Sequence, residues 1–365
     1  MRALLLTTTL MAVVCTAPAA AQTAPPAQSK PAEPPAIRVG TTIFYDYTYQ
    51  FEPKSTDVDG NQFSPNGFNL TRGYLNITGA VSRHISFRIT PDVTRESGSS
   101  SSLNGTIVFR LKFAYAQFAL DDWLPEGSHG RLGMQPTLFL ESQESVYRYR
   151  FQGTQFAERD GGLNSSDLGA AFRTTIPGGY GDAGVALFNG EGYTKAEAND
   201  QKALEIRATV RPFAASAGAA HGLRVTVFRL QDHYVRGADR LRTYFSAMFE
   251  HSHFNAGFDY MSGADQPNAG VPRVESDGYS FFFTPFFQEK GSGPEALLRF
   301  DSFKPDTTLD GRRHRLIVGA AYWFPHPGSN ANAALLLDYE QVTFDNAPVP
   351  ETTQKRLTLH GLIQF

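Results

Sequence analysis

An all-β transmembrane antiparallel β-barrel of about 16 strands is the fold that the sequence predicts. Three observations support it. Apolar residues alternate with polar or small residues along most of the chain, which is the period of a strand with one buried face. Many alternating segments span about 10 to 14 residues, which exceeds soluble strands but suits tilted membrane strands. The 29 Phe, 15 Tyr and 33 Gly beside only 5 Met argue against a helical bundle.

The N-terminal segment is predicted to be a signal peptide covering residues 1–21. Arg2 precedes an apolar stretch at residues 3–14, and three alanines at residues 19–21 resemble a signal-peptidase site. Cys15 offers an alternative, a lipidated terminus, which the bulky valine before it disfavours. Because this is the one cysteine of the chain, no disulfide can form within it. We therefore expect an exported protein of the bacterial cell outer membrane.

The following segment, residues 22–36, is predicted to be a Pro/Ala-rich disordered periplasmic tether, because it lacks aromatic anchors. The barrel domain is predicted to cover residues 37–365. No apolar run after the N-terminus is long enough for a transmembrane helix. The formal net charge of -3 argues against a nucleic-acid-binding protein.

The period-two pattern defines the candidate strands and the two faces of each. An even number of strands brings both chain ends to one side of a barrel, as single-chain outer-membrane barrels require. In residues 107–115, Ile107, Phe109, Leu111, Phe113 and Tyr115 are predicted to share one face. The candidate strands are residues 38–50, 68–81, 84–94, 106–120, 130–140, 165–176, 180–190, 201–211, 222–232, 239–250, 253–262, 274–286, 295–304, 312–324, 331–344 and 353–365.

Long polar connections are predicted to be external loops, and shorter links to be turns at the other rim. The long ones are residues 51–67, 95–105, 141–164, 190–200 and 262–273. The links at 121–129 and 212–221 are longer than this scheme expects. A secreted two-sheet sandwich is the soluble alternative, and strands of this length fit it poorly.

The final strand carries a second indication of an outer-membrane barrel. Leu357, Leu359, Gly361, Ile363 and Phe365 share one face, and Phe365 is the last residue. A terminal aromatic residue in register on such a strand resembles the signal that the bacterial barrel-assembly machinery reads. We therefore expect this machinery to be a partner of the chain.

Three segments carry a resemblance to a known family. They are GYLNITGAVSRHISFRITPDVT at residues 73–94, FRLKFAYAQFAL at 109–120 and RLGMQPTLFLESQESVYRYRFQGTQFAERDGG at 131–162. They resemble the phosphate-selective porin O/P family. The resemblance implies a homotrimeric, sixteen-stranded porin embedded in outer-membrane lipid. It also implies that the third external loop, which is residues 141–164 by the strand count, folds inward and narrows the pore.

The alternation of side chains between the two faces of each strand predicts which cations line such a pore. Ion selectivity arises from fixed charges close to the permeating ion, and the planar guanidinium of arginine suits oxyanions such as phosphate. The predicted pore-lining, anion-binding residues are Arg72, Arg88, Arg110, Lys112, Arg173, Arg240, Arg242, Arg299 and Arg315. Small anions are therefore the predicted solutes.

The predicted constriction loop carries charges of both signs. Arg148 and Arg150 alternate with aromatic residues, so an extended segment would place both arginines on one face. The acidic residues could instead pair with arginines and fix the loop to the wall. The predicted constriction residues are Glu141, Glu144, Tyr147, Arg148, Tyr149, Arg150, Glu158, Arg159 and Asp160.

Other motifs point to no cofactor, metal or catalytic site. The glycine pattern at 179–184 opens a strand instead of a helix, so it cannot hold a pyrophosphate as a dinucleotide fold does. Residues 57–61 resemble the start of a calcium loop but lack the later glutamate. His251 and His253 form an i, i+2 pair at a predicted tight turn, which does not by itself make the ligand set of a metal site.

The predicted function is passive diffusion of small anions, with phosphate as the specific case. A general non-selective diffusion porin is the first alternative. An outer-membrane hydrolase would need an outward Ser-His pair, and none is evident. A closed structural barrel is the remaining class. We therefore predict that the chain is not an enzyme.

Overall fold

The structure is a computed structural model that describes residues 36–99, 101–326, 331–346 and 351–365. The predicted signal peptide, residues 1–21, lies outside the described residues, as do residues 22–35 of the predicted tether. Ala36, which was assigned to the tether, is the first residue of β1. The barrel therefore begins one residue earlier than predicted.

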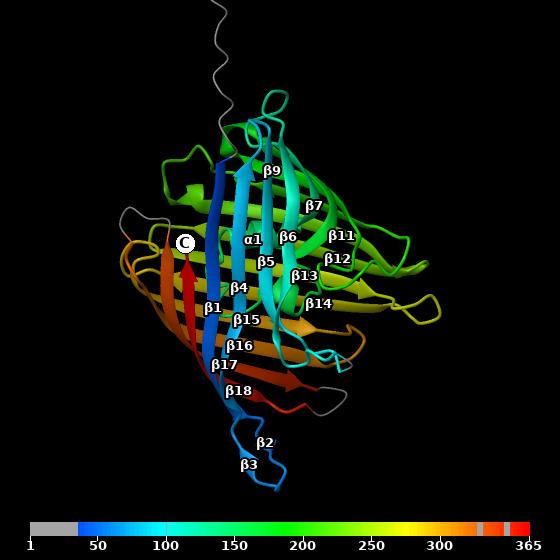
Figure 1. The fold of residues 1–365 in the computed structure, drawn as a ribbon, viewed down its shortest axis with the longest axis vertical. Coiled ribbons are helices and arrows are strands. Elements are labelled where there is room, and N and C mark those ends of the chain that lie inside the picture. Colours follow the sequence, from blue (N-terminus) through cyan, green and yellow to red (C-terminus); the bar gives the residue numbers. More distant parts are fainter. Residues whose placement is uncertain (1–35, 100, 327–330, 347–350) are drawn as a thin grey trace, which may run out of the picture. The chain divides into compact units, whose positions relative to one another are not determined.

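Within the described residues, sixteen antiparallel strands form a closed barrel, in which β1 pairs with β4 on one side and with β18 on the other. Figure 1 shows β1 and β18 side by side where the barrel closes. The predicted all-β barrel of about 16 strands is thus confirmed. The strands are β1 (Ala36–Glu52), β4 (Asn66–Ala80), β5 (Ile85–Arg95), β6 (Ile107–Ala119), β7 (His129–Pro136), β8 (Ser166–Ile176), β9 (Gly181–Phe188), β10 (Ala203–Val210), β11 (Leu223–Val235), β12 (Ala238–Glu250), β13 (Phe254–Asp265), β14 (Val274–Pro285), β15 (Gly293–Lys304), β16 (Arg312–Trp323), β17 (Asn332–Asp345) and β18 (Gln354–Gln364).

Short elements occupy the connections. A two-stranded hairpin of β2 (Ser55–Thr56) and β3 (Gln62–Phe63) extends beyond the ends of β1 and β4, at the lower end of Figure 1. Helices α1 (Leu138–Glu144) and α2 (Phe156–Arg159) lie between β7 and β8. Two 3-10 turns, Pro177–Gly179 and Ala219–Gly222, lie at the opposite rim. No helix in the described part of the chain is both long and apolar enough to cross a membrane.

One predicted strand is too long. The segment predicted as 130–140 ends at Pro136, and Leu138–Glu144 forms α1 instead. The three apolar residues that open α1 are all buried. A short continuous apolar run does not distinguish a buried helix from a buried strand, because neither periodicity is visible in it.

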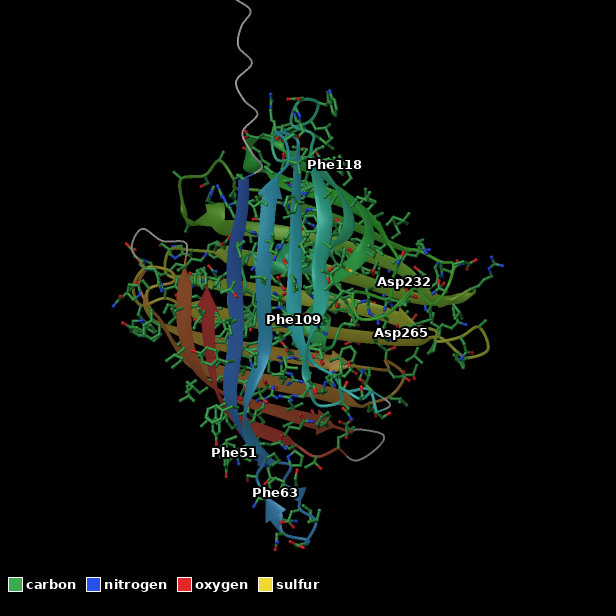
Figure 2. All side chains as sticks on the ribbon, in the orientation of Figure 1. Phe51, Phe63, Phe109, Phe118, Asp232 and Asp265 are labelled. Carbon is green, nitrogen blue, oxygen red and sulfur yellow. The ribbon has the colours of Figure 1, made fainter. Side chains whose placement is uncertain are left out.

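The outer face of the barrel is apolar. Phe109 on β6 is 74% exposed, and Figure 2 labels it together with Phe51, Phe63 and Phe118. The outward residues of β16 and β18 are likewise exposed, among them Leu316, Val318, Leu357 and Leu359. Exposed apolar area of this extent is typical of a surface that contacts lipid or another protein.

The alternation predicted for residues 107–115 breaks at one point. Opposite Pro91, β6 holds one extra residue, Lys112, in a β-bulge. Proline has no backbone N–H for the ladder, and bulges accommodate such positions. Beyond the bulge Phe113 and Tyr115 face the interior, where each ring lies within 5.0 Å of an arginine. The prediction that both share the outward face of Phe109 was therefore wrong.

The interior of the barrel contains a hydrophobic core. One cluster joins Leu138, Phe139 and Leu140 of α1 to inward residues of β9–β13. A second cluster joins residues 146–151 to inward residues of β1, β12 and β14–β18. The connection between β7 and β8 therefore packs against the inside of the barrel wall, and it is called the inner loop (residues 137–165) below.

Candidate functional site

Helix α1 attaches the start of the inner loop to the wall of β10–β12. The backbone N–H of Leu138 donates to Oε2 of Glu205 on β10 over 2.9 Å. The ring of Phe139, which has no exposed surface, lies 4.5 Å from the Tyr244 ring and 5.2 Å from the Phe228 ring. The apolar contacts and the buried hydrogen bond together hold the helix against this side of the barrel.

The middle of the inner loop is fixed by Glu295 on β15. Nη1 of Arg148 donates to both carboxylate oxygens of Glu295, over 3.0 and 3.1 Å. The hydroxyl of Tyr149 donates to Oε2 of the same residue over 2.8 Å. Burial, assisted by the Glu295 carboxylate, raises the pKa of Tyr149, so this hydroxyl remains a donor. Arg148 also stacks on the Trp323 ring at 4.0 Å.

Arg150 has different partners from Arg148. Its Nε donates to Glu144 over 2.9 Å, and its Nη2 donates to Glu158. The segment around it is a turn instead of an extended strand. The extended segment that would place both arginines on one face is therefore absent here. Arg148 pairs with the wall and Arg150 pairs within the loop, and both line one cavity.

The end of the inner loop is held by further ion pairs. Burial opposes ionisation of Glu158, but the charges of Arg150 and Lys112 outweigh it and hold its pKa below the usual range. Burial raises the pKa of Asp160 although Arg313 of β16 donates to it. Arg159 lies 3.9 Å from a carboxylate oxygen of a glutamate on β17.

Seven of the nine predicted pore-lining cations pair with carboxylates of the wall. Arg72 and Arg110 share Asp92 of β5, at 2.8 and 3.1 Å. Figure 2 labels Asp232 and Asp265, which pair with the arginines of β12. The other pairs are Arg173 with Asp182, Arg240 with Asp232, Arg242 with Asp265, Arg299 with Asp301 and Arg315 with Glu340. The alternation along each strand could predict that these cations point inward, but it could not predict which carboxylates pair with them.

Arg88 and Lys112 differ from the other seven, because neither has a carboxylate within ion-pair distance among the described residues. Nε of Arg88 donates to Thr90 over 3.0 Å and its Nη2 donates to Asn76 over 2.9 Å. Nζ of Lys112 donates to the hydroxyl of Ser165. Arg88 therefore keeps its positive charge among neutral hydrogen-bond partners, whereas Lys112 lies near enough to Glu158 to help hold the pKa of that carboxylate below its usual range.

Tyr193 covers Lys112, and sequence reasoning missed this residue. It belongs to the connection between β9 and β10, and its ring centroid lies 3.6 Å from Nζ of Lys112 and 4.8 Å from the Arg110 guanidinium carbon. Its hydroxyl accepts from Nη1 of Arg72 over 3.3 Å. Only 2% of Lys112 is exposed, so this inward lysine is shielded from the interior space. A lone tyrosine in a polar loop offers no sequence signal for such a role.

A cavity of about 380 Å³ lies between the inner loop and the wall of β1, β4–β6 and β16–β18. Its charged lining includes Arg88, Lys112, Arg148 and Arg150 together with Glu141 and Glu144 of α1. Glu141 pairs with an arginine of β7 over 2.8 Å, and Glu144 pairs with Arg150. Among the arginines of the described lining, Arg88 thus has no carboxylate partner.

No group of three or more His, Cys, Asp or Glu side chains in the described ranges is arranged to hold a metal ion.

Comparison with solved structures identifies the architecture. The anion-selective porin from Comamonas acidovorans superposes with a TM-score of 0.60 at 12% identity, covering 91% of this chain and 100% of that one. The outer membrane channel DcaP of Acinetobacter baumannii gives 0.61 at 11% identity, covering 91% and 97%. OmpT, an outer membrane protein of Vibrio cholerae in its trimer form, gives 0.55 at 10%, covering 91% and 100%. The chain has the fold of the outer-membrane porins.

Sequence comparison adds nothing to this result. No protein-family model matches the chain, and a comparison with curated protein sequences finds no match. The resemblance to the phosphate-selective porin O/P family therefore stays a prediction. At about 12% identity or less, the structural likeness concerns the fold alone.

Proposed function

We propose that this protein is an outer-membrane porin through which small anions diffuse passively. The porin fold and the exposed apolar outer face support a place in lipid. The predicted signal peptide supports export, and a homotrimer is supported by the solved trimer form of one structural neighbour. Phe365, in register on the closing edge, supports recognition by the barrel-assembly machinery.

The observation that carries the anion preference is the charge balance of the cavity. Arg88 lines it with a guanidinium whose partners are neutral, whereas the other arginine side chains there pair with carboxylates. An uncompensated cation lowers the free energy of an anion that enters. One cation with neutral partners attracts anions weakly enough to release them, as conduction requires.

Phosphate selectivity is a finer proposal with less support. A phosphate site would need several unpaired arginines at one height, and seven of the nine predicted cations pair with wall carboxylates instead. Glu141 and Glu144 beside the cavity favour the alternative of a general diffusion porin. We propose no catalytic role for this chain.

A closed structural barrel is the second candidate, because the two hydrophobic clusters occupy much of the interior. The 380 Å³ cavity beside them favours an open channel. Conductance in a planar bilayer distinguishes the two, since a closed barrel passes no current.

The test of the anion preference is the reversal potential under a potassium chloride gradient. We expect a potential on the anion side for the wild type and a lower anion/cation permeability ratio for Arg88→Gln. Arg83→Gln is the matched control, because Arg83 lies in an exposed turn and pairs with Asp122 there. An unchanged ratio in Arg88→Gln, or a cation-side potential in the wild type, would contradict the proposal.

A further inference from the structure

We propose that the cavity binds aromatic monocarboxylates, of which benzoate is the simplest, as they pass through the barrel. This inference rests on the proposed function, because it names the class of anion that the same cavity would conduct. The inference is based on an arc of aromatic rings that lies beside one accessible guanidinium.

The rings come from four elements that are distant in sequence. Phe44 of β1 lies 6.4 Å from Tyr74 of β4 and 6.3 Å from Phe151 of the inner loop, measured between ring centroids. Phe151 lies 5.9 Å from Trp323 of β16. All four residues line the cavity, and they are called the aromatic arc. The separations are those at which aromatic rings interact favourably. Phe44, Phe151 and Trp323 are at most 8% exposed, so the half-buried Tyr74 is the ring of the arc that a planar ligand can contact.

The charges around the arc select one negative charge on that ligand. Arg148 is neutralised by Glu295, and Arg150 by Glu144 and Glu158. Lys112 is shielded by Tyr193, so the Arg88 guanidinium is the uncompensated cation left to face the cavity among the described lining residues.

The described lining of the cavity offers no cation for a second negative charge. Glu141 and Glu144 line it, and each is already paired with an arginine, so a carboxylate at the far end of a ligand would meet no unpaired cation among the described residues there. A monoanion needs one cation only, if its carboxylate faces Arg88 and its ring faces the arc.

The size of the cavity agrees with an organic ligand. Its volume of about 380 Å³ falls within the range of roughly 300–1,000 Å³ that small-molecule sites occupy. A hydrated inorganic anion gains nothing from aromatic surface, whereas the ring of benzoate can stack or meet the arc edge to face. The expected preference is modest, which permits release of the anion.

The experiment uses the full chain in a planar bilayer and measures the block of chloride current by added benzoate or acetate. Both probes carry one carboxylate, and only benzoate carries a ring. We expect benzoate to block half of the current at a concentration about two- to tenfold lower than acetate, the ratio that one aromatic contact supplies. Cyclohexanecarboxylate, which has a similar size and no aromatic face, should resemble acetate more closely than benzoate.

Variants of Tyr74 test the arc itself, since Tyr74 is a partly exposed member of it. Tyr74→Leu should bring the half-blocking concentration of benzoate to that of acetate, and Tyr74→Phe, which restores a ring, should restore the preference. Phe109→Leu on the outer face is the matched control.

Equal block by benzoate and acetate in the wild type would overturn the inference, as would equal block by benzoate and cyclohexanecarboxylate. An unchanged benzoate block in Tyr74→Leu would do the same. Failure of the porin proposal is distinguishable, because it appears before any carboxylate is added, as absent current or a cation-side reversal potential.

Discussion

Two regions of the barrel wall have the same alternation of inward and outward residues, but they contact the inner loop in different ways. The wall of β9–β17 presents buried apolar side chains such as Phe228, Leu297 and Leu336, and the inner loop packs on them. The wall of β4–β6 presents Asn76 and Arg88, and the cavity lies there. The inner loop thus packs on the apolar side, and the cavity lies between it and the polar side.

The difference shows that the hydrophobic effect positions the open path in this barrel. Burial of apolar area is non-directional and draws the loop toward any matching apolar wall. Ion pairs such as Arg148 with Glu295 then fix the orientation of the loop, because the Glu295 side chain is fully buried and the Arg148 side chain is only 16% exposed. In the proposed porin, charge selectivity depends on Arg88 of the opposite wall, which has no carboxylate partner among the described residues.

Removal of the buried Phe139 ring should have the largest effect on conductance and on the unfolding temperature. Phe139→Ala deletes a ring that is packed between Tyr244 and Phe228. Truncation of a buried phenylalanine costs about 3–5 kcal/mol, which we expect to loosen the inner loop from β10–β12. Single-channel conductance should rise and the unfolding temperature should fall.

Phe109→Ala on the outer face serves as the control for Phe139→Ala, since it removes the same ring where the inner loop is absent. If Phe139→Ala lowers the unfolding temperature and leaves the conductance at the wild-type value, the apolar wall does not hold the loop.

Removal of the Tyr193 ring, which covers Lys112, should have a smaller effect, on the anion/cation permeability ratio. Tyr193→Ala exposes Lys112 and Arg110, which contact the Tyr193 ring. Cation–π contacts contribute about 0.5–2 kcal/mol, so the fold should persist while the anion/cation permeability ratio increases. Tyr193→Phe keeps the ring and should keep the wild-type ratio. A ratio in Tyr193→Ala equal to or below the wild-type ratio would show that the shield does not limit selectivity.

The smallest effect concerns pH. Glu158 accepts from Arg150 and from the Ser165 hydroxyl, and its pKa is lower when folded than the value of about 4.3 in an unfolded chain. Its contribution to stability is therefore fully present above about pH 4.3 and is lost as pH falls through the lower folded value. Conductance measured from pH 8 to pH 3 should stay constant down to about pH 5 and become noisier below the folded pKa of Glu158. Glu158→Gln should show that noise at every pH, and a change near pH 6 would contradict this assignment.

The sequence by itself determined the strands and most of their faces. Apolar alternation is a local property, so sixteen strands and the closure of β1 on β18 could be predicted without knowledge of any contact. The prediction of faces from this alternation failed at Lys112, because the bulge opposite Pro91 moves Phe113 and Tyr115 to the other face of the strand. A single extra residue changes the face of every residue after it, and no period reveals it in advance.

Only the tertiary structure decided which charges are available. Parity predicted nine inward cations equally, yet seven pair with carboxylates from the same or a neighbouring strand. The acids that pair with them, such as Asp92 and Glu340, are placed by strand register. Tyr193 reaches Lys112 across 81 positions of the chain. Apart from the pair of Arg299 and Asp301 on one strand, these are contacts between separate segments, and a pattern of neighbours along the chain carries no information about them.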